Sequence, residues 1–289
     1  MMADLLVLTL TWAQLSAAAA VLFVLALRPA ARRLLGPELA YRLWMLVPIA
    51  ATTSLFPTLR EFLTRYGNPH IPVLAPGFSG VVLAVFAAGV LATVLLFAHG
   101  ERRFRRLASQ RRAGPAVVGL SWPRIVVPAD YEARFTAAER RLILEHERAH
   151  IARRDPRDNL VIAAVQALGW CNPLVHLAVR FVRLDQELAC DAAVVARMPD
   201  SRGLYARTLL KAHGGAPPSV FACALADGGL HPLEVRLRNL KRARPTVDQY
   251  VKGVMLVGGL AILTAVSVWS LSPKTMSSSE PLPIVSPSG

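Results

Sequence analysis

The chain has 289 residues, of which 54% are hydrophobic, and its 33 Lys and Arg against 19 Asp and Glu give a formal net charge of +14. A large apolar fraction combined with a large net charge implies separate apolar and charged segments, which excludes a simple soluble globule and a disordered chain. The three cysteines, Cys171, Cys190 and Cys223, form no CxxC pair. This excludes a disulfide framework and a cysteine zinc cluster, so we expect reduced thiols.

Apolar stretches long enough to cross a membrane occur at four places. A helix needs roughly 20 apolar residues to span a hydrocarbon core of about 30 Å. The second stretch is the weakest, because it is short and contains two prolines. The first is not typical of a signal peptide, because no Lys or Arg precedes it. We therefore predict four spans, at Leu5–Leu27, Leu43–Leu59, Ile71–Ala98 (chiefly Phe78–Ala98) and Gly253–Pro273.

Basic residues gather in the first loop, residues 28–42, and directly after the third span, residues 101–106. The positive-inside rule then places the N-terminus outside and residues 99–252 in the cytosol. This topology, with attraction to anionic lipid, accounts for the net charge, so we expect a lipid bilayer as partner and no direct nucleic-acid binding. The predicted domains are a three-span region 1–98, a cytosolic domain 99–250, a fourth span 251–273 and a short Ser/Pro-rich outer tail 274–289.

Residues 146–150 read His-Glu-Arg-Ala-His, an HExxH motif. Two His four residues apart lie on one helix face and can both bind Zn²⁺ at about 2.0–2.1 Å. Zinc lowers the pKa of a bound water toward about 7, and Glu147 is placed to accept its proton. A capping box at Thr136–Glu139 predicts the start of the helix, and Asp155-Pro156 predicts its end.

A catalytic zinc needs a third protein ligand, and the sequence favours Glu187. Glu187 and Asp191 are four residues apart, so one can bind the metal while the other accepts a hydrogen bond from a ligand His. Asp155, Asp185 and His176 are the alternatives that we keep for the third ligand.

Residues 159–179 form a fifth apolar stretch, long enough to span. If residues 160–179 crossed the bilayer, Glu187 would lie about 30 Å from His150, on the wrong side. We therefore predict a buried core helix, or a helix that dips into the membrane face without crossing. Asn172-Pro173 is expected to break it.

These motifs together resemble the integral-membrane zinc metallopeptidases of the BlaR/MecR antirepressor type. The resemblance implies an α-helical multi-pass membrane protein with a mainly α, small α+β gluzincin-like zinc-peptidase domain between spans three and four. It implies one catalytic Zn²⁺ on His146, His150 and Glu187, with Glu147 catalytic and Asp191 supporting. It also implies an edge strand at 119–128, where Ile125, Val126 and Val127 could hold an extended substrate. The residues that carry the resemblance are Gly119–Pro128, Leu144–Asp155, Trp170–Leu174 and Arg183–Asp191.

The implied function is regulatory proteolysis, in a bacterial plasma membrane, of a cytosolic DNA-binding repressor. Self-cleavage in the cytosolic region before the last span is a further hypothesis, motivated by the Gly-rich segment 212–232, and a homodimer is left open. Members of the family that sense β-lactams carry a penicillin-binding domain after the last span. Only 16 residues follow Pro273 here, and no Lys has Ser three residues before it, so we expect that domain to be missing.

Other functional classes remain as alternatives. A housekeeping membrane quality-control protease shares HExxH and the downstream ExxxD. An intramembrane site-two protease is disfavoured, because five arginines surround the motif and lipid penalises each of them. A non-catalytic membrane scaffold or receptor with structural zinc is disfavoured, because structural zinc sites have four protein ligands.

Overall fold

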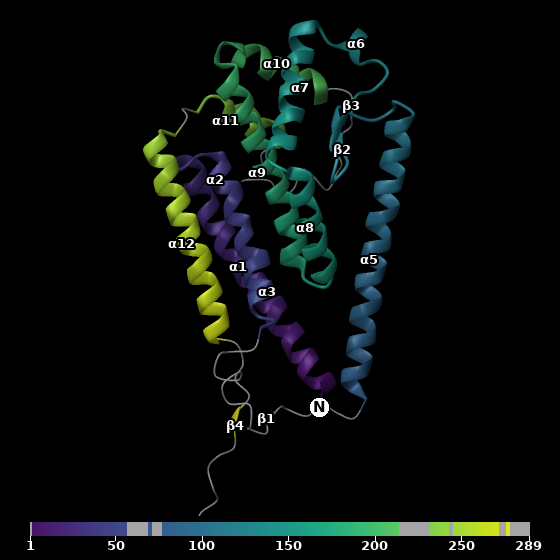
Figure 1. Ribbon diagram of the computed structural model, residues 1–289, viewed down its shortest axis with the longest axis vertical. Coiled ribbons are helices and arrows are strands. Elements are labelled where there is room, and N and C mark those ends of the chain that lie inside the picture. Colours follow the sequence, from purple (N-terminus) through teal and green to yellow (C-terminus); the bar gives the residue numbers. More distant parts are fainter. Residues whose placement is uncertain are drawn as a thin grey trace, which may run out of the picture.

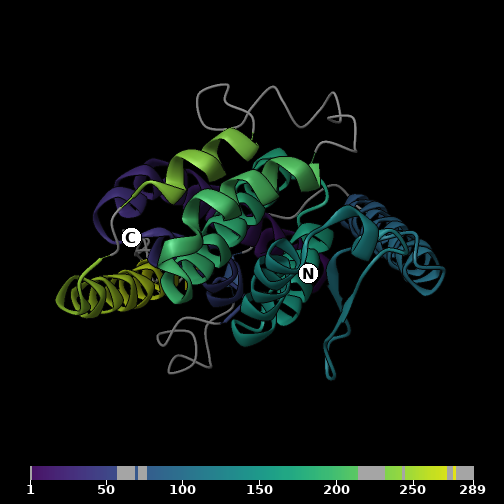
Figure 2. The same ribbon diagram turned by 90° about the horizontal axis from the view of Figure 1, so that it is seen from above.

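A computed structural model describes residues 2–56, 69–70, 77–213, 232–242, 245–271 and 276–277. The described chain is mostly helical, and three of its helices are long and apolar enough to cross a membrane. They are α1 (Met2–Leu34), α5 (Phe78–Ser109) and α12 (Val247–Leu271), and they run along the long axis of the molecule (Figure 1). Seen from above, α5 and α12 stand on opposite sides, with the remaining helices between them (Figure 2).

The predicted second span has a different form from the other three. A helical run is divided into α2 (Pro37–Arg42), a 3₁₀ turn η1 (Leu43–Met45) and α3 (Leu46–Thr53). Pro48 has no backbone N–H, so the helical hydrogen bond to residue 44 cannot form and the run tightens there. Residues 57–59 of the predicted span lie outside the described residues, and the four-span arrangement stays a prediction.

The largest buried cluster joins α1 and α3 to α9 (Pro173–Arg197). Val24, Leu46 and Val182 meet there. Further along α9, the buried carboxylate of Asp185 accepts three hydrogen bonds. The donors are Arg28 Nε at 3.1 Å, Arg32 Nε at 2.6 Å and Trp44 Nε1 at 2.7 Å. Arg28 and Arg32, which the sequence placed in the first basic loop, therefore belong to α1 and form buried ion pairs that tie this helix to α9.

The remaining helices gather toward the end of the molecule where α1 and α5 finish, and α8 with the first part of α9 extends back between the long helices (Figure 1). They are α6 (Tyr131–Arg134), α7 (Ala137–Ala152), α8 (Asp155–Leu168), α9, a 3₁₀ turn η2 (Pro199–Ser201), α10 (Arg202–His213) and α11 (Pro232–Leu240). A second buried cluster holds α7, α9, α10 and α11 together through Leu142, Val194, Tyr205, Leu209 and Leu240.

The ends of α7 follow the predicted signals. Thr136 and Glu139 form the capping box, with Thr136 N–H donating to the Glu139 carboxylate at 2.8 Å and Glu139 N–H donating to the Thr136 hydroxyl at 3.3 Å. At the other end, Arg154 takes a left-handed conformation (φ +62°), and Pro156 lies in the first turn of α8. The chain therefore turns sharply at 153–154 and begins a new helix.

The fifth apolar stretch folds as a hairpin of α8 and the first part of α9. Asn172 caps α9 by accepting from Leu174 N–H at 3.1 Å, and Pro173 occupies the first turn. The predicted break at Asn172-Pro173 is confirmed. Because the chain reverses there, Glu187 returns to the side where α7 lies.

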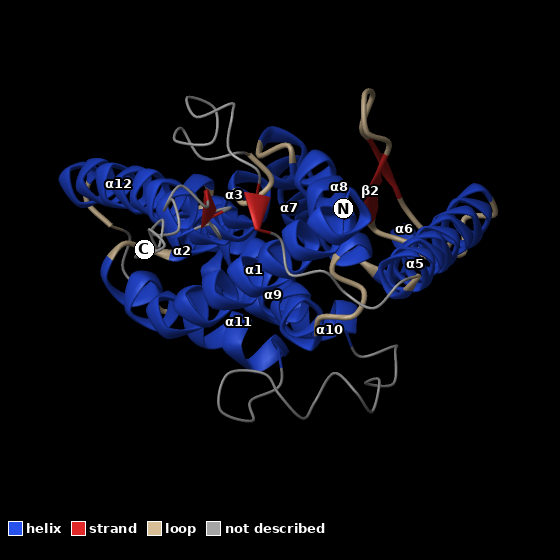
Figure 3. Cartoon of the chain, turned by 90° about the horizontal axis from the view of Figure 1, so that it is seen from below, coloured by secondary structure: helices blue, strands red, loops and turns tan. Residues whose placement is uncertain are grey.

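Two short antiparallel strand pairs complete the fold (Figure 3). One pairs β1 (Pro69–His70) with β4 (Met276–Ser277), and the other pairs β2 (Ala116–Val118) with β3 (Arg124–Val126). The expected edge strand at 119–128 is therefore too long, because residues 119–123 form the turn and Val127 follows the strand. Gly119 is required in that turn, since its φ is +105° and a Cβ would lie 2.6 Å from the Trp122 carbonyl oxygen.

Candidate metal centre

Three donor atoms converge where α7 crosses α9. His146 Nε2 lies 3.1 Å from His150 Nε2 and 3.3 Å from Glu187 Oε2, and His150 Nε2 lies 3.7 Å from Glu187 Oε1. Tetrahedral zinc with ligand bonds of about 2.0–2.1 Å places neighbouring donors about 3.3 Å apart. The three side chains therefore fit a zinc ion with one position left open.

The other ring nitrogen of each histidine is held by a neighbour. His150 Nδ1 lies 2.7 Å from buried Asp155 Oδ2, and His146 Nδ1 lies 2.8 Å from the Tyr205 hydroxyl. Tyr205 in turn donates to Asp191 Oδ1 at 2.6 Å. Contacts of this kind orient both Nε2 atoms toward the shared space, as partners of metal-binding histidines do. Asp191 Oδ1 itself lies 3.3 Å from His146 Nδ1, and Tyr205 is an additional link between the two residues.

The alternative third ligands are used elsewhere. Asp185 is held by arginines, and His176 Nε2 lies 2.8 Å from the Trp170 carbonyl oxygen. A second group of possible metal ligands lies close together and consists of His150, Asp155 and Cys190. This group uses Nδ1 of His150 and not Nε2. Burial raises the pKa of the Cys190 thiol, which disfavours the thiolate that a metal ligand requires. Glu187 is the acidic residue that shares the Nε2 side with both histidines.

Glu147 lies beside this cluster and is buried. Within the described chain its carboxylate forms no hydrogen bond, and burial raises its pKa above the usual range. A carboxylate with a raised pKa is suited to accept and return a proton near neutral pH. Burial therefore moves the pKa of Glu147 in the direction that favours proton exchange with water.

Arg236 of α11 contacts the carboxylates of the cluster, and its role was not predicted from the sequence. It donates to Asp191 through Nε and Nη2, both at 2.8 Å, and its Nη1 lies 2.9 Å from Glu187 Oε2. Although burial alone would raise the pKa of Glu187, Arg236 and His146 lower it to about 2. A signal was present, since Arg236 shares a helix face with Leu233 and Leu240 and so interrupts an apolar stripe.

The β-hairpin packs on α7, so Ile125 and Val126 lie on the strand pair next to the metal-binding helix. The Gly-rich segment 212–232, which motivates the self-cleavage hypothesis, falls largely on 214–231, which lies outside the described residues, as does Cys223.

Comparison with known proteins matches most of the chain to one family. The family described as BlaR1 peptidase M56 matches residues 8–75 and 98–240, which include every residue of the cluster. A curated relative, "Regulatory protein BlaR1" of Bacillus licheniformis, is 31% identical over 98 residues. The matched part is 34% of this chain and 16% of the relative, so the chain matches about a sixth of that protein's length.

Proposed function

The chain belongs to the BlaR1 peptidase M56 family, and we propose that it is a membrane-bound zinc endopeptidase of the BlaR1 regulatory kind that cleaves a cytosolic transcriptional repressor. The observation that carries the proposal is the triangle of His146, His150 and Glu187 donors, with edges of 3.1 to 3.7 Å and an open side. A site with three protein ligands favours catalysis over a structural role.

Each residue of the cluster has a role in this proposal. His146, His150 and Glu187 hold the zinc ion, which when bound supplies a Lewis acid that polarises the peptide carbonyl and acidifies water. Glu147 takes a proton from the attacking water and passes it to the leaving nitrogen. Asp191 and Asp155 keep the histidines oriented. The β3 edge of the β2–β3 hairpin, where Ile125 and Val126 are half-buried, binds substrate as an added strand, and Val127 extends it.

We place four spans in a bacterial plasma membrane, with the N-terminus and the tail 274–289 outside and the domain 99–250 in the cytosol. The course of the long helices supports this arrangement, because α1 and α5 run toward the end where α7 lies, and α12 runs away from it (Figure 1). The basic segments at 28–42 and 101–106 then lie on the same side as the metal cluster.

The test compares new protein N-termini across the proteome in cells that express equal amounts of the wild type or Glu147→Gln. We expect a cut in one small DNA-binding protein in wild-type cells, and a loss of about 10²- to 10⁴-fold in cleavage for Glu147→Gln. Purified Glu147→Gln should keep the zinc content of the wild type, because the three ligands are intact. Glu145→Gln, the same substitution on α7 outside the triangle, is the matched control.

If the cuts were spread over many unstable membrane proteins, the result would contradict the regulatory role and would favour a quality-control protease. Unchanged signalling with Glu147→Gln would favour a scaffold whose zinc is structural.

A further inference from the structure

The tip of the hairpin formed by α8 and α9 contacts two of the long helices near the middle of their predicted membrane spans. At its tip, the Leu168 carbonyl accepts from Gln14 Nε2 at 2.9 Å, and Asn172 Nδ2 donates to the Gln14 carbonyl at 3.0 Å. Gln14 lies near the middle of the span predicted at Leu5–Leu27. On the other side, a Cβ on Gly89 would lie 2.1 Å from the Trp170 ring, and Gly89 is near the middle of Phe78–Ala98.

The tip also has the chemistry of a segment inside lipid. Backbone groups in the hydrocarbon region must be satisfied within the protein. Besides the bonds to Gln14, Asn172 N–H donates to the Gly169 carbonyl at 2.8 Å, and the Trp170 carbonyl lies 2.8 Å from His176 Nε2. The outer surface of α8 is apolar, with Leu160 57% and Leu168 53% exposed.

The length of α8 places its charged end at the membrane surface. From Leu168 back to Asp158 the helix rises about 15 Å, which is half of a hydrocarbon core of about 30 Å. Residues 153–158 therefore lie at the cytosolic boundary of the lipid when the tip lies at the midplane.

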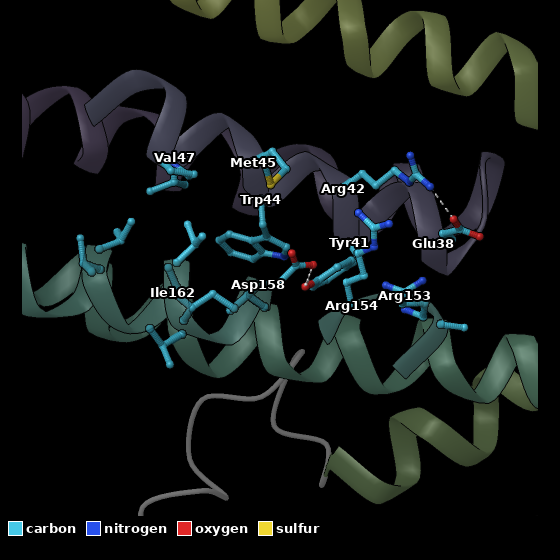
Figure 4. A pocket seen from close by; sticks show the side chains of 18 residues that line it. Glu38, Tyr41, Arg42, Trp44, Met45, Val47, Arg153, Arg154, Asp158 and Ile162 are labelled. Carbon is cyan, nitrogen blue, oxygen red and sulfur yellow. Dashed lines mark hydrogen bonds and ion pairs between the residues drawn. The ribbon is translucent and has the colours of Figure 1, made fainter. Parts of the chain in front are cut away.

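A cavity of about 640 Å³ lies between this hairpin and the run α2–η1–α3 (Figure 4). One part of its wall is apolar and includes Val47, Ile162 and Val165. The other part is charged and is formed by Glu38, Arg42, Arg153, Arg154 and Asp158. The volume and the mixture of an apolar wall with a few polar groups are typical of ligand sites.

The charged part of the wall has a surplus of positive charge. Arg42 pairs with Glu38 at 2.8 Å, and Asp158 accepts from Tyr41 at 2.8 Å. Within the described part of the chain, the Arg154 guanidinium forms no hydrogen bond or ion pair, and the side chain is exposed. It is therefore a cation at the lipid boundary that is available to an external anion.

We propose that this cavity binds one anionic glycerophospholipid of the cytosolic leaflet. The acyl chain lies along the apolar wall, and the phosphate binds Arg154 with Arg42 beside it. Charge complementarity and the depth of the two ends select this occupant, because the apolar part lies within the hydrocarbon and the cationic part at its surface. The site adjoins the metal cluster, since Arg153 Nε lies 3.4 Å from Asp155, which contacts His150. This lipid site does not depend on the peptidase activity proposed above.

The test measures lipid retained by the full-length protein. The protein is reconstituted in nanodiscs that contain equal amounts of phosphatidylglycerol and phosphatidylcholine, released into mild detergent and weighed by native mass spectrometry. We expect one phosphatidylglycerol per chain. Arg154→Gln should lower the preference for it about tenfold, the effect of losing one charge-assisted hydrogen bond. Arg102→Gln, the same charge change on α5 away from the cavity, should keep it.

A second variant tests the apolar wall. Ile162→Trp, which fills the cavity, should lower retention of both lipids, whereas Leu160→Trp on the outer face of α8 should not. Equal retention of the two lipids by the wild type, or equal behaviour of Arg154→Gln and Arg102→Gln, would overturn the proposal. So would a dimer that Ile162→Trp dissociates, because a second copy would then be the occupant.

Discussion

At the scale of single residues, the cluster combines parts that are distant in the sequence. His146, Glu147 and His150 come from little more than one turn of α7, whereas Glu187 and Asp191 come from α9. Arg236 comes from a third helix and contacts both of the α9 carboxylates. It is a positioning residue in this arrangement, because it holds a proposed ligand without being one.

Arg236→Gln is expected to weaken zinc binding about 10- to 100-fold, the range found when partners of metal ligands are removed. Zinc affinity is measured by competition with a chromogenic chelator. The matched control is Arg238→Gln, two residues along the same helix, where the arginine is exposed and pairs with Glu234 at 2.6 Å. Arg236→Lys should recover part of the affinity, because it restores a cation. Equal zinc affinity in the two Gln variants would contradict the assignment.

At the scale of elements, α9 is the helix that connects the hairpin tip, α1 and the metal cluster. Its first turn lies at the hairpin tip, its middle is tied to α1 through Asp185, and Glu187 follows half a turn later. A helix fixed at these points cannot rotate without breaking a buried ion pair. The position of Glu187 therefore depends on α1 as well as on α7.

Asp185→Asn should destabilise the protein by about 3–5 kcal/mol, because it removes the charge of the buried carboxylate that accepts from two buried arginines. Thermal unfolding in detergent measures the change. Asp200→Asn, in the exposed 3₁₀ turn η2, serves as control and should unfold like the wild type. An unchanged melting temperature for Asp185→Asn would show that the buried pair does not hold α9.

The contact between α5 and the hairpin can be tested at one glycine. Gly89→Leu should lower the melting temperature, because its side chain must displace the Trp170 ring. Gly80→Leu on the same helix should not, since no atom lies within 4 Å of a Cβ placed there. If both variants unfold alike, α5 does not pack on the hairpin.

At the scale of the whole molecule, the helices that carry the cluster lie at one end of the three long helices (Figure 1). From Pro173 to Glu187, α9 rises about 21 Å, whereas half a bilayer core is about 15 Å. With the hairpin tip at the midplane, the metal cluster lies just above the lipid surface.

Cysteine labelling checks the proposed orientation. In a chain without its native cysteines, a membrane-impermeant maleimide should label Ser286→Cys in intact spheroplasts. It should label Ser109→Cys at the end of α5 only after lysis, because that position is proposed to be cytosolic. If Ser109→Cys were labelled in intact spheroplasts and Ser286→Cys only after lysis, the protein would have the opposite orientation in the membrane.

The sequence by itself determined the parts that depend on local physics. The capping box of α7, the break at Asn172-Pro173 and the three long apolar helices follow from helix signals and continuous hydropathy, and the motif spacing indicated the family. Only the tertiary structure decided which distant side chains meet. Arg236 reaches Glu187 and Asp191, Tyr205 links His146 to Asp191, and the hairpin descends to Gln14. These contacts arise from the packing of helices far apart in the chain, and local spacing carries no information about such packing.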